Sequence, residues 1–282
     1  MNFNSLNLGE LDKDLSDEER REWNAIYASY RSGSLLTGMV RGMDTINVGG
    51  MQNINCLVVI DYRVKVLIPE NEIWFDDNTK RPSHVLRSMA GAPVDYVITA
   101  VDRNGECCVA SRRKALYIRR KAFLKLPPRE GQKCECAFIA VGRAKILCCC
   151  GGFDVTLPAK DISYAMVPDL RERFSTGVIK SAIIKSYDSE NGELKISVKE
   201  AAPHPFDGAD RRHPLNCRRA SVITGKYGGG VFCRLEDDLD CLCTYSPRQY
   251  DADFHIGDQV IIVVTKFAYS KKQIYGKIVA KW

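Results

Sequence analysis

Two segments of the chain repeat each other at a fixed interval. The first begins at Asp102, passes through an Asn-Gly pair and ends at Ala115; the second runs in the same way from Asp188 to Ala201, and both end points are 86 residues apart. A period of this length indicates a duplicated structural unit. In each copy, alternating apolar residues flank the Asn-Gly pair, which is typical of a β-hairpin. The repeat therefore predicts a series of small β-domains rather than one large core.

Length and composition set the class of protein. The chain has 282 residues, which is enough for two or three domains, and it is 45% hydrophobic and 27% charged, as in an ordinary globular protein. Its uncharged apolar runs are as long as strands and much shorter than the roughly 20 residues of a membrane helix. The N-terminus lacks the basic start and apolar segment of a signal peptide. We therefore expect a cytoplasmic protein.

The twelve cysteines do not form a zinc pattern. Nine of them occur as C-x-C pairs or adjacent runs inside alternating segments, and none has the C-x₂-C or Cys/His spacing of a metal site. We expect reduced thiols that act as small hydrophobic strand residues, and no cofactor. A metal or redox role for these thiols is the alternative.

The positive charge is unevenly distributed. The net charge is +6, but residues 9–19 hold six acids against one lysine, so the rest of the chain carries +11. A basic body of this kind suits an anionic partner such as nucleic acid, although charged faces are often simply solvated.

A helix is predicted near the N-terminus. Ser16 followed by Glu19 forms a capping box, and the helix should continue to about Tyr30. Trp23 and Ile26 fall on one face, so we expect this face to pack against the first β-domain, with a partner-binding helix as the alternative.

The rest of the chain divides into three units of five strands. Each of the first two has a helical insert between its third and fourth strands, at residues 71–90 and 161–175, as in a Greek-key barrel of the OB type. The predicted fold class is mostly β: three tandem five-stranded OB-fold Greek-key barrels preceded by an N-terminal helix. The expected domains are an acidic leader and helix (1–33), barrel 1 with a basic linker helix (34–126), barrel 2 (127–203) and barrel 3 (204–282).

Residues 112–129 are the most basic stretch of the chain, with eight lysines and arginines and no acid. They are predicted to form the linker helix, which ends at Pro127-Pro128. Two interpretations stay open. The helix is either a surface that contacts phosphates, with Arg112 and Arg113 as candidates, or a solvated connector.

The third unit resembles a known family. It contains an aromatic-glycine turn at Tyr227, then Val-Phe-Cys around Phe232, Ser246, and a Gly-Asp-Gln-Val segment that starts at Gly257. These features are similar to the RNA-binding domain of bacterial ribosomal protein S-one. The ends of the two repeated hairpins resemble the fifth-strand signature of the same family, so the resemblance covers residues 34–282 as three tandem copies.

The resemblance implies binding of single-stranded RNA. OB barrels stack unpaired bases on exposed aromatic side chains within a basic groove. Tyr227 and Phe232 match the stacking aromatics, unless Phe232 faces the core. The candidate phosphate contacts are Lys226, Arg234, Lys271 and Lys272.

The chain also departs from the family. Thr244 and Pro69 stand where the third strand usually has histidine, and the first two units lack the Tyr-Gly…Phe pattern. Phe153 in the second unit and Tyr62 in the first are the remaining aromatic candidates. This favours weak RNA binding or protein docking for the first two barrels.

No catalytic motif is evident in the sequence. The glycine-rich segment at residues 225–230 lacks the spacing of a phosphate loop and precedes a strand, and the four histidines are scattered. The acids at residues 236–240 are typical of a solvated loop. We expect a protein that is not an enzyme and that binds single-stranded RNA in translation or RNA metabolism. The alternatives are a scaffold that docks the ribosome, RNA polymerase or a nuclease, and the RNA-delivery part of a larger enzyme.

Overall fold

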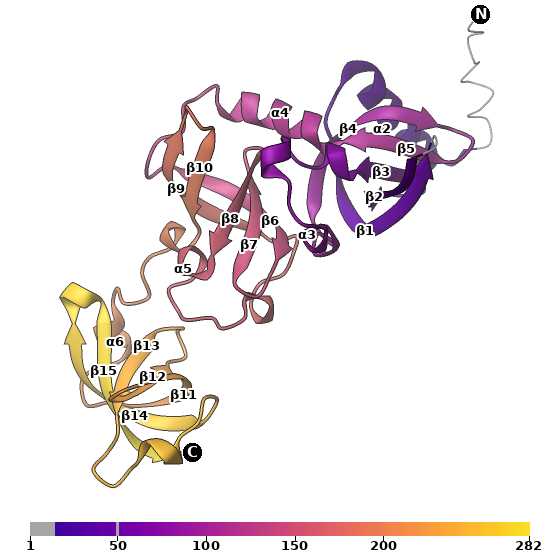
Figure 1. Cartoon of the computed structure of the whole chain (residues 1–282). Helices are drawn as coiled ribbons and strands as arrows, with labels where there is room; N and C mark the ends of the chain where they lie inside the picture. Colours follow the sequence, from indigo (N-terminus) through magenta and orange to yellow (C-terminus); the bar gives the residue numbers. More distant parts are fainter. Residues whose placement is uncertain (1–14, 49–50) are drawn as a thin grey trace, which may run out of the picture. The chain divides into compact units, whose positions relative to one another are not determined.

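The computed structural model describes residues 15–48 and 51–282. The fold is mostly β and contains three five-stranded sheets, two of which close into barrels. The chain forms two compact units (Figure 1). Unit 1 comprises Met1–Leu157 and Asp169–Ile196, and unit 2 comprises Pro158–Pro168 and Ser197–Trp282.

The elements follow one another in a repeated pattern of strands with short helices between them. The strands are β1 (Leu36–Val48), β2 (Met51–Ile60), β3 (Lys65–Pro69), β4 (Pro93–Asp102), β5 (Cys107–Ser111), β6 (Lys133–Val141), β7 (Lys145–Cys150), β8 (Phe153–Pro158), β9 (Ile179–Asp188), β10 (Glu193–Ser197), β11 (Arg218–Tyr227), β12 (Gly230–Arg234), β13 (Asp240–Thr244), β14 (Gln259–Ala268) and β15 (Gln273–Lys281). The α-helices are α2 (Asp17–Ser32), α3 (Ser83–Arg87), α4 (Arg112–Phe123), α5 (Ala159–Ile162) and α6 (Ala209–Arg212). The 3₁₀ helices are η1 (Glu70–Glu72), η2 (Asp77–Thr79), η3 (Leu170–Glu172), η4 (Lys199–Ala201), η5 (Asp251–Asp253) and η6 (Tyr269–Lys271).

The first sheet closes in the order β1-β2-β3-β5-β4. Its strands pair antiparallel except β3 and β5, which run parallel with Lys65 opposite Cys107. One parallel contact closes an otherwise antiparallel five-stranded sheet, as expected for an OB-type barrel. The interior is filled by fully buried aliphatic side chains such as Leu57 and Ile68.

Helix α2 packs against this barrel, as the sequence predicted. Ser16 and Glu19 form the capping box at its start, and Trp23 and Ile26 are buried in the core of unit 1. Near its end, the Ser29 hydroxyl accepts a hydrogen bond of 3.1 Å from the backbone N–H of Ile98.

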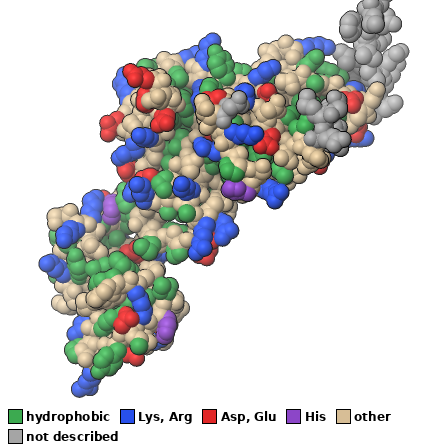
Figure 2. Space-filling view, viewed as in Figure 1, with side chains coloured by type: hydrophobic (Ala, Val, Ile, Leu, Met, Phe, Trp, Pro, Cys, Tyr) green, Lys and Arg blue, Asp and Glu red, His purple; other side chains and the backbone are tan. Residues whose placement is uncertain are grey.

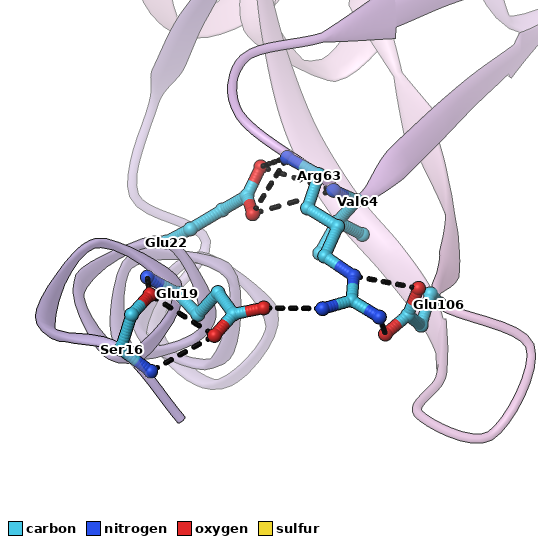
Figure 3. A network of polar contacts seen from close by, with 6 residues as sticks. All are labelled: Ser16, Glu19, Glu22, Arg63, Val64 and Glu106. Carbon is cyan, nitrogen blue, oxygen red and sulfur yellow. Dashed lines mark hydrogen bonds and ion pairs between the residues drawn. The ribbon is translucent and has the colours of Figure 1, made fainter. Parts of the chain in front are cut away.

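Carboxylates of α2 also bind the turn before β3 (Figure 3). The Glu22 carboxylate accepts hydrogen bonds from the backbone N–H groups of Tyr62, Arg63 and Val64, at 3.1 to 3.3 Å. The Arg63 guanidinium lies between Glu19 at 2.5 Å and Glu106 at 2.9 Å. These contacts satisfy backbone donors that no strand partner reaches.

The repeated segments form the closing hairpins of the first two sheets, β4–β5 and β9–β10. At the turn of the first, the Asp102 carboxylate accepts a hydrogen bond of 3.1 Å from the N–H of Gly105. At the second, the Asp188 carboxylate accepts bonds from the N–H groups of Glu190 and Asn191, at 2.9 and 3.2 Å. An aspartate that binds its own turn is therefore what the two copies share.

The second sheet has the strand order β10-β9-β6-β7-β8 and does not close by a ladder, which differs from the predicted barrel. Its edges are joined through one residue of α5 instead. The Asp161 carbonyl accepts bonds from the Val198 N–H at 2.9 Å and from the Ser197 hydroxyl at 3.3 Å. β8 ends at Pro158, directly before α5.

Helix α4 joins the first two sheets within unit 1. The Arg112 guanidinium binds the Asp154 carboxylate at 2.6 and 2.7 Å and the Ile73 carbonyl at 3.0 Å. Further along the helix, Arg120 lies over the rings of Phe75 and Phe153, with 3.5 and 4.4 Å to the centroids. The first turn of this helix is neither a phosphate-contacting surface nor a solvated connector. It is part of the core of unit 1.

The third sheet closes in the order β11-β12-β13-β15-β14, with β13 and β15 parallel as in the first barrel. The core includes Cys233, Cys241 and Cys243, which are fully buried. A Cβ at Gly230 would lie 2.0 Å from the Cys243 carbonyl oxygen, so the strand pairing requires glycine there.

Eight of the twelve cysteines are buried and four are half-buried, and none forms a disulfide. In residues 15–48 and 51–282, no group of three or more histidines, cysteines or acids has the arrangement of a metal site. No helix in the part of the chain that the structure describes is long and apolar enough to cross a membrane.

Candidate nucleic-acid interface

A groove of about 510 Å³ lies in unit 2, on the outer face of the third barrel. Its walls come from β12 and the turn after it, from η6, and from the segments around α5 and η4. Aromatic and cationic side chains share this groove; the ones used below are Phe232, Tyr164, His204, Lys160, Lys199, Lys271 and Lys272. On the visible face of unit 2, Figure 2 likewise shows hydrophobic side chains next to lysines and arginines.

Phe232 faces this groove. Its neighbours on β12, Val231 and Cys233, are fully buried, and alternation along the strand places Phe232 on the opposite, half-buried face. The alternative that Phe232 belongs to the core is therefore wrong. The Tyr227 ring lies beside it, with 5.3 Å between centroids and a tilt of 56°. Tyr227 itself lines a separate hollow with the glycines that follow it and with Tyr245.

The segments around α5 and η4 bring a second aromatic pair to the groove. The rings of Tyr164 and His204 lie 4.1 Å apart at 48°, and the Lys199 ammonium is 5.2 Å from the centre of the Tyr164 ring. The His204 Nδ1 accepts a hydrogen bond of 3.0 Å from the N–H of Phe206, which fixes the ring. Burial, together with the charge of Lys272, lowers the pKa of His204 below its usual value, so the ring is neutral at pH 7.

Two acids, Asp238 and Asp240, line the groove beside its four lysines, and Asp240 is paired with a cation of the protein. The Asp240 carboxylate accepts a bond of 3.2 Å from Arg234 and another of 3.3 Å from the Met166 N–H. Of the lysines, Lys272 lies 3.3 Å from Asp207 in an exposed ion pair, which is weak and easily exchanged. The groove therefore offers a positive surface to an anion.

Two predicted phosphate contacts in the third barrel are engaged elsewhere. The Lys226 ammonium binds the carbonyl and carboxylate of Asp251, at 2.7 and 3.2 Å. The Arg234 guanidinium binds Asp240 and the Met166 carbonyl. Both side chains hold loops against the barrel, so an RNA phosphate would have to displace these partners.

Two predicted contacts in unit 1 are wrong. Arg112 is 1% exposed and bound by Asp154, and Phe153 is 3% exposed and packs against Phe123 and Tyr187, so neither reaches a surface. The third candidate, Arg113, is half-buried, and its Nε donates a bond of 2.9 Å to the Trp74 carbonyl. In the first barrel, Tyr62 is 57% exposed at the turn before β3.

The chain is similar in sequence to several bS1 proteins. No family model matches the chain. It is 20% identical over 274 residues to the small ribosomal subunit protein bS1 of Coxiella burnetii, with coverage of 92% of this chain and 47% of that protein. It is 22% identical over 255 residues to the bS1 protein of Chlamydia trachomatis, with coverage of 87% and 42%.

One relative is a protein of a different kind. The chain is 24% identical over 250 residues to 4-hydroxy-3-methylbut-2-enyl diphosphate reductase of Clostridium acetobutylicum, with coverage of 82% of this chain and 37% of the reductase. The chain thus spans less than half the length of these curated relatives.

Solved structures give weaker likenesses. One is a multidomain protein with nucleic acid binding domains from Streptococcus pneumoniae, with 12% identity, a TM-score of 0.22, and coverage of 88% of this chain and 73% of that one. Another is the CSD456 part of Drosophila Unr, with 10% identity, a TM-score of 0.22, and coverage of 88% and 97%. At these scores we base no argument on them. The similarity to several bS1 proteins supports an S1-like family for this chain.

Proposed function

We propose that the chain is a non-catalytic protein of the cytoplasm that binds single-stranded RNA in the groove of unit 2 and acts in translation or RNA metabolism. One observation carries the proposal. Phe232 is held on the outer face of the third barrel and shares a groove with the Tyr164–His204 pair and four lysines. The bS1 relatives are proteins of the small ribosomal subunit, which supports a link to the ribosome.

The arrangement suits an unpaired strand. A base that stacks on an aromatic side chain gains about 1–3 kcal/mol, and this gain needs an unpaired base with both faces open. Phe232 and Tyr164 supply such rings from two sides of the groove, while Lys271 and Lys272 lie at the same groove for the backbone. Binding should weaken steeply with salt, with a slope of about −0.7 per phosphate contact in a log–log plot.

We propose no reductase activity for the chain. The stretch shared with the Clostridium reductase covers 37% of that protein. The groove of unit 2 brings together aromatic side chains and lysines, which suits binding. In that longer relative, the region similar to this chain would then be a binding part.

The test is a fluorescence-anisotropy titration of the full chain with a labelled 12-nucleotide oligouridine, its DNA counterpart and a duplex RNA, at several salt concentrations. We expect binding to the single strands, and the Phe232→Ala, Tyr164→Ala double variant should lose about tenfold or more in affinity. Tyr250→Ala is the matched control, because Tyr250 is 72% exposed in the same unit and does not line the groove.

Two outcomes would overturn the proposal. One is the absence of any binding at low salt, which would favour a scaffold that docks the ribosome, RNA polymerase or a nuclease. The other is an affinity in the double variant equal to that of Tyr250→Ala, which would remove the groove as the binding site.

A further inference from the structure

A second hollow, of about 480 Å³, lies within unit 1, between the first two sheets. One wall is the segment before and along α3, and the other is the β6–β7 hairpin with the outer face of β8. Its volume falls in the range of small-molecule sites. None of the described residues that line it is acidic.

Three cations border this hollow: Arg81, Arg143 and Lys145. The Nε of Arg81 is buried and has no hydrogen-bond partner, which is costly for a guanidinium unless a ligand supplies the acceptor. Arg143 and Lys145 are exposed at the turn of the hairpin. The carboxylate that acts on Arg143, Asp169, is already bound by Arg171 at 2.5 Å, so it does not neutralise the hollow.

The floor of the hollow is apolar. Leu147 is buried, and Val85 and Ala140 complete a surface that a bare inorganic anion would leave uncovered. The Thr156 hydroxyl lies at the same hollow and can orient a polar edge. An anion attached to a flat ring matches both parts, because the anion meets the arginines and the ring covers the floor.

The walls are fixed in place by backbone hydrogen bonds. The Gly142 N–H donates to the Lys145 carbonyl at 3.0 Å and closes the hairpin turn, and the Leu170 N–H donates to the Arg143 carbonyl at 2.9 Å. On the other side, the Val85 N–H donates to the Pro82 carbonyl at 2.9 Å. A ligand would therefore meet cations that are already positioned, which lowers the entropy cost of binding.

We propose that this hollow of unit 1 is a binding site for a nucleoside phosphate, whose phosphate contacts Arg81, Arg143 and Lys145 and whose base covers Val85 and Leu147. The same chemistry can arrive as a free nucleotide or as one nucleotide of an RNA strand. The site is separate from the groove of unit 2 and does not depend on it.

Isothermal titration calorimetry of the full chain with uridine 5′-monophosphate, uridine and inorganic phosphate tests the ligand class. We expect the nucleotide to bind more tightly than either of its parts. The Arg143→Gln, Lys145→Gln double variant should lose about tenfold or more in nucleotide affinity, since charge-assisted hydrogen bonds are removed. The control is Lys133→Gln with Lys180→Gln, two exposed lysines of the same unit away from the hollow, which should stay within about twofold.

A second set of titrations, with the oligouridine in place of the mononucleotide, shows whether the ligand is a free nucleotide or part of an RNA strand. If only strand binding weakens in Arg143→Gln, Lys145→Gln, the ligand is part of an RNA strand; if mononucleotide binding weakens, it is a free nucleotide. The Phe232→Ala, Tyr164→Ala variant tests the groove and the Arg143→Gln, Lys145→Gln variant tests this hollow, so failure of the groove and failure of this site are distinguishable. The proposal is overturned if neither ligand is affected, or if both double variants behave alike.

Discussion

The guanidinium of Arg112 and the carboxylate of Asp154 lie 2.6 Å apart, and their side chains are only 2% and 3% exposed. Arg112 begins helix α4, which follows the first sheet, and Asp154 lies on strand β8 of the second sheet. The pair is therefore a charged contact inside the protein rather than on its surface, and its removal should affect unit 1 as a whole.

Arg112→Ala should destabilise the chain by about 3–5 kcal/mol, because it leaves a buried carboxylate without its partner. Urea unfolding followed by circular dichroism measures the change. The Arg112→Met, Asp154→Leu double variant should recover most of the loss, since it removes both charges. Arg119→Ala is the control: its pair with Asp95 is more exposed and should be worth about 1 kcal/mol or less. Equal effects at both positions would contradict the interpretation.

Docking of α2 should weaken in acid. The N–H of Ser16 and the guanidinium of Arg63 lower the pKa of Glu19 from its usual value of 4.5. The ionised carboxylate therefore stabilises the folded state fully above that value, and this contribution is lost as the pH falls through the lowered pKa.

Fluorine NMR of 5-fluorotryptophan-labelled protein reports the docking directly, because Trp23 is buried under α2 with the Arg103 guanidinium 4.0 Å from its ring. The Trp23 resonance, assigned with Trp23→Phe, should shift toward the exposed value as the pH falls below about 4.5, through the lowered pKa of Glu19. In Glu19→Gln the acid-dependent part of the shift should be smaller. A Trp23 resonance that is independent of pH in both proteins would refute the link.

The salt dependence of RNA binding should identify the lysines that contact phosphate. Lys271→Gln with Lys272→Gln should reduce the slope of log affinity against log salt by about 1.4, since each lost phosphate contact contributes about 0.7. Anisotropy titrations with oligouridine at four salt concentrations give the slope. The Lys133→Gln, Lys180→Gln variant should keep the original slope, and an unchanged slope in the first variant would remove these lysines from the interface.

Thiol labelling should depend on unfolding. Burial raises the pKa of Cys56 to about 11 and that of Cys108 to about 12, so both thiols are protonated and shielded at pH 8. Iodoacetamide treatment followed by mass spectrometry should label them slowly in the native chain and rapidly in urea. Cys217, which is half-buried, should be labelled earlier. Rapid native labelling of Cys108 would show that the first barrel opens locally.

Alternating sequence patterns predicted the strands well. Each of the three sheets has the expected five strands, and along β13 and the first part of β15 buried positions alternate with less buried ones. The same alternation determines that Phe232 lies outside the core, since Val231 and Cys233 must face inward. Local patterns of this kind are visible in sequence because neighbouring residues determine them.

Contacts between distant segments could not be predicted. Tyr164 and His204 are 40 residues apart in irregular segments. No sequence periodicity relates the two positions, so the contact between their rings could not be predicted. The strand pattern favours an exposed Phe153 because it does not reveal that α4 covers this ring. The contacts of α5 with the end of β10 likewise join distant segments, which the strand pattern leaves undetermined.

The buried ion pair also limits how this chain can be divided. A fragment that ended at residue 126 would keep Arg112 and lose Asp154, and one that began at residue 127 would bury an unmatched carboxylate. The first two sheets are therefore best kept together in one fragment. The repeat thus gives two copies of one fold, and the buried ion pair between the two copies makes them one structural unit.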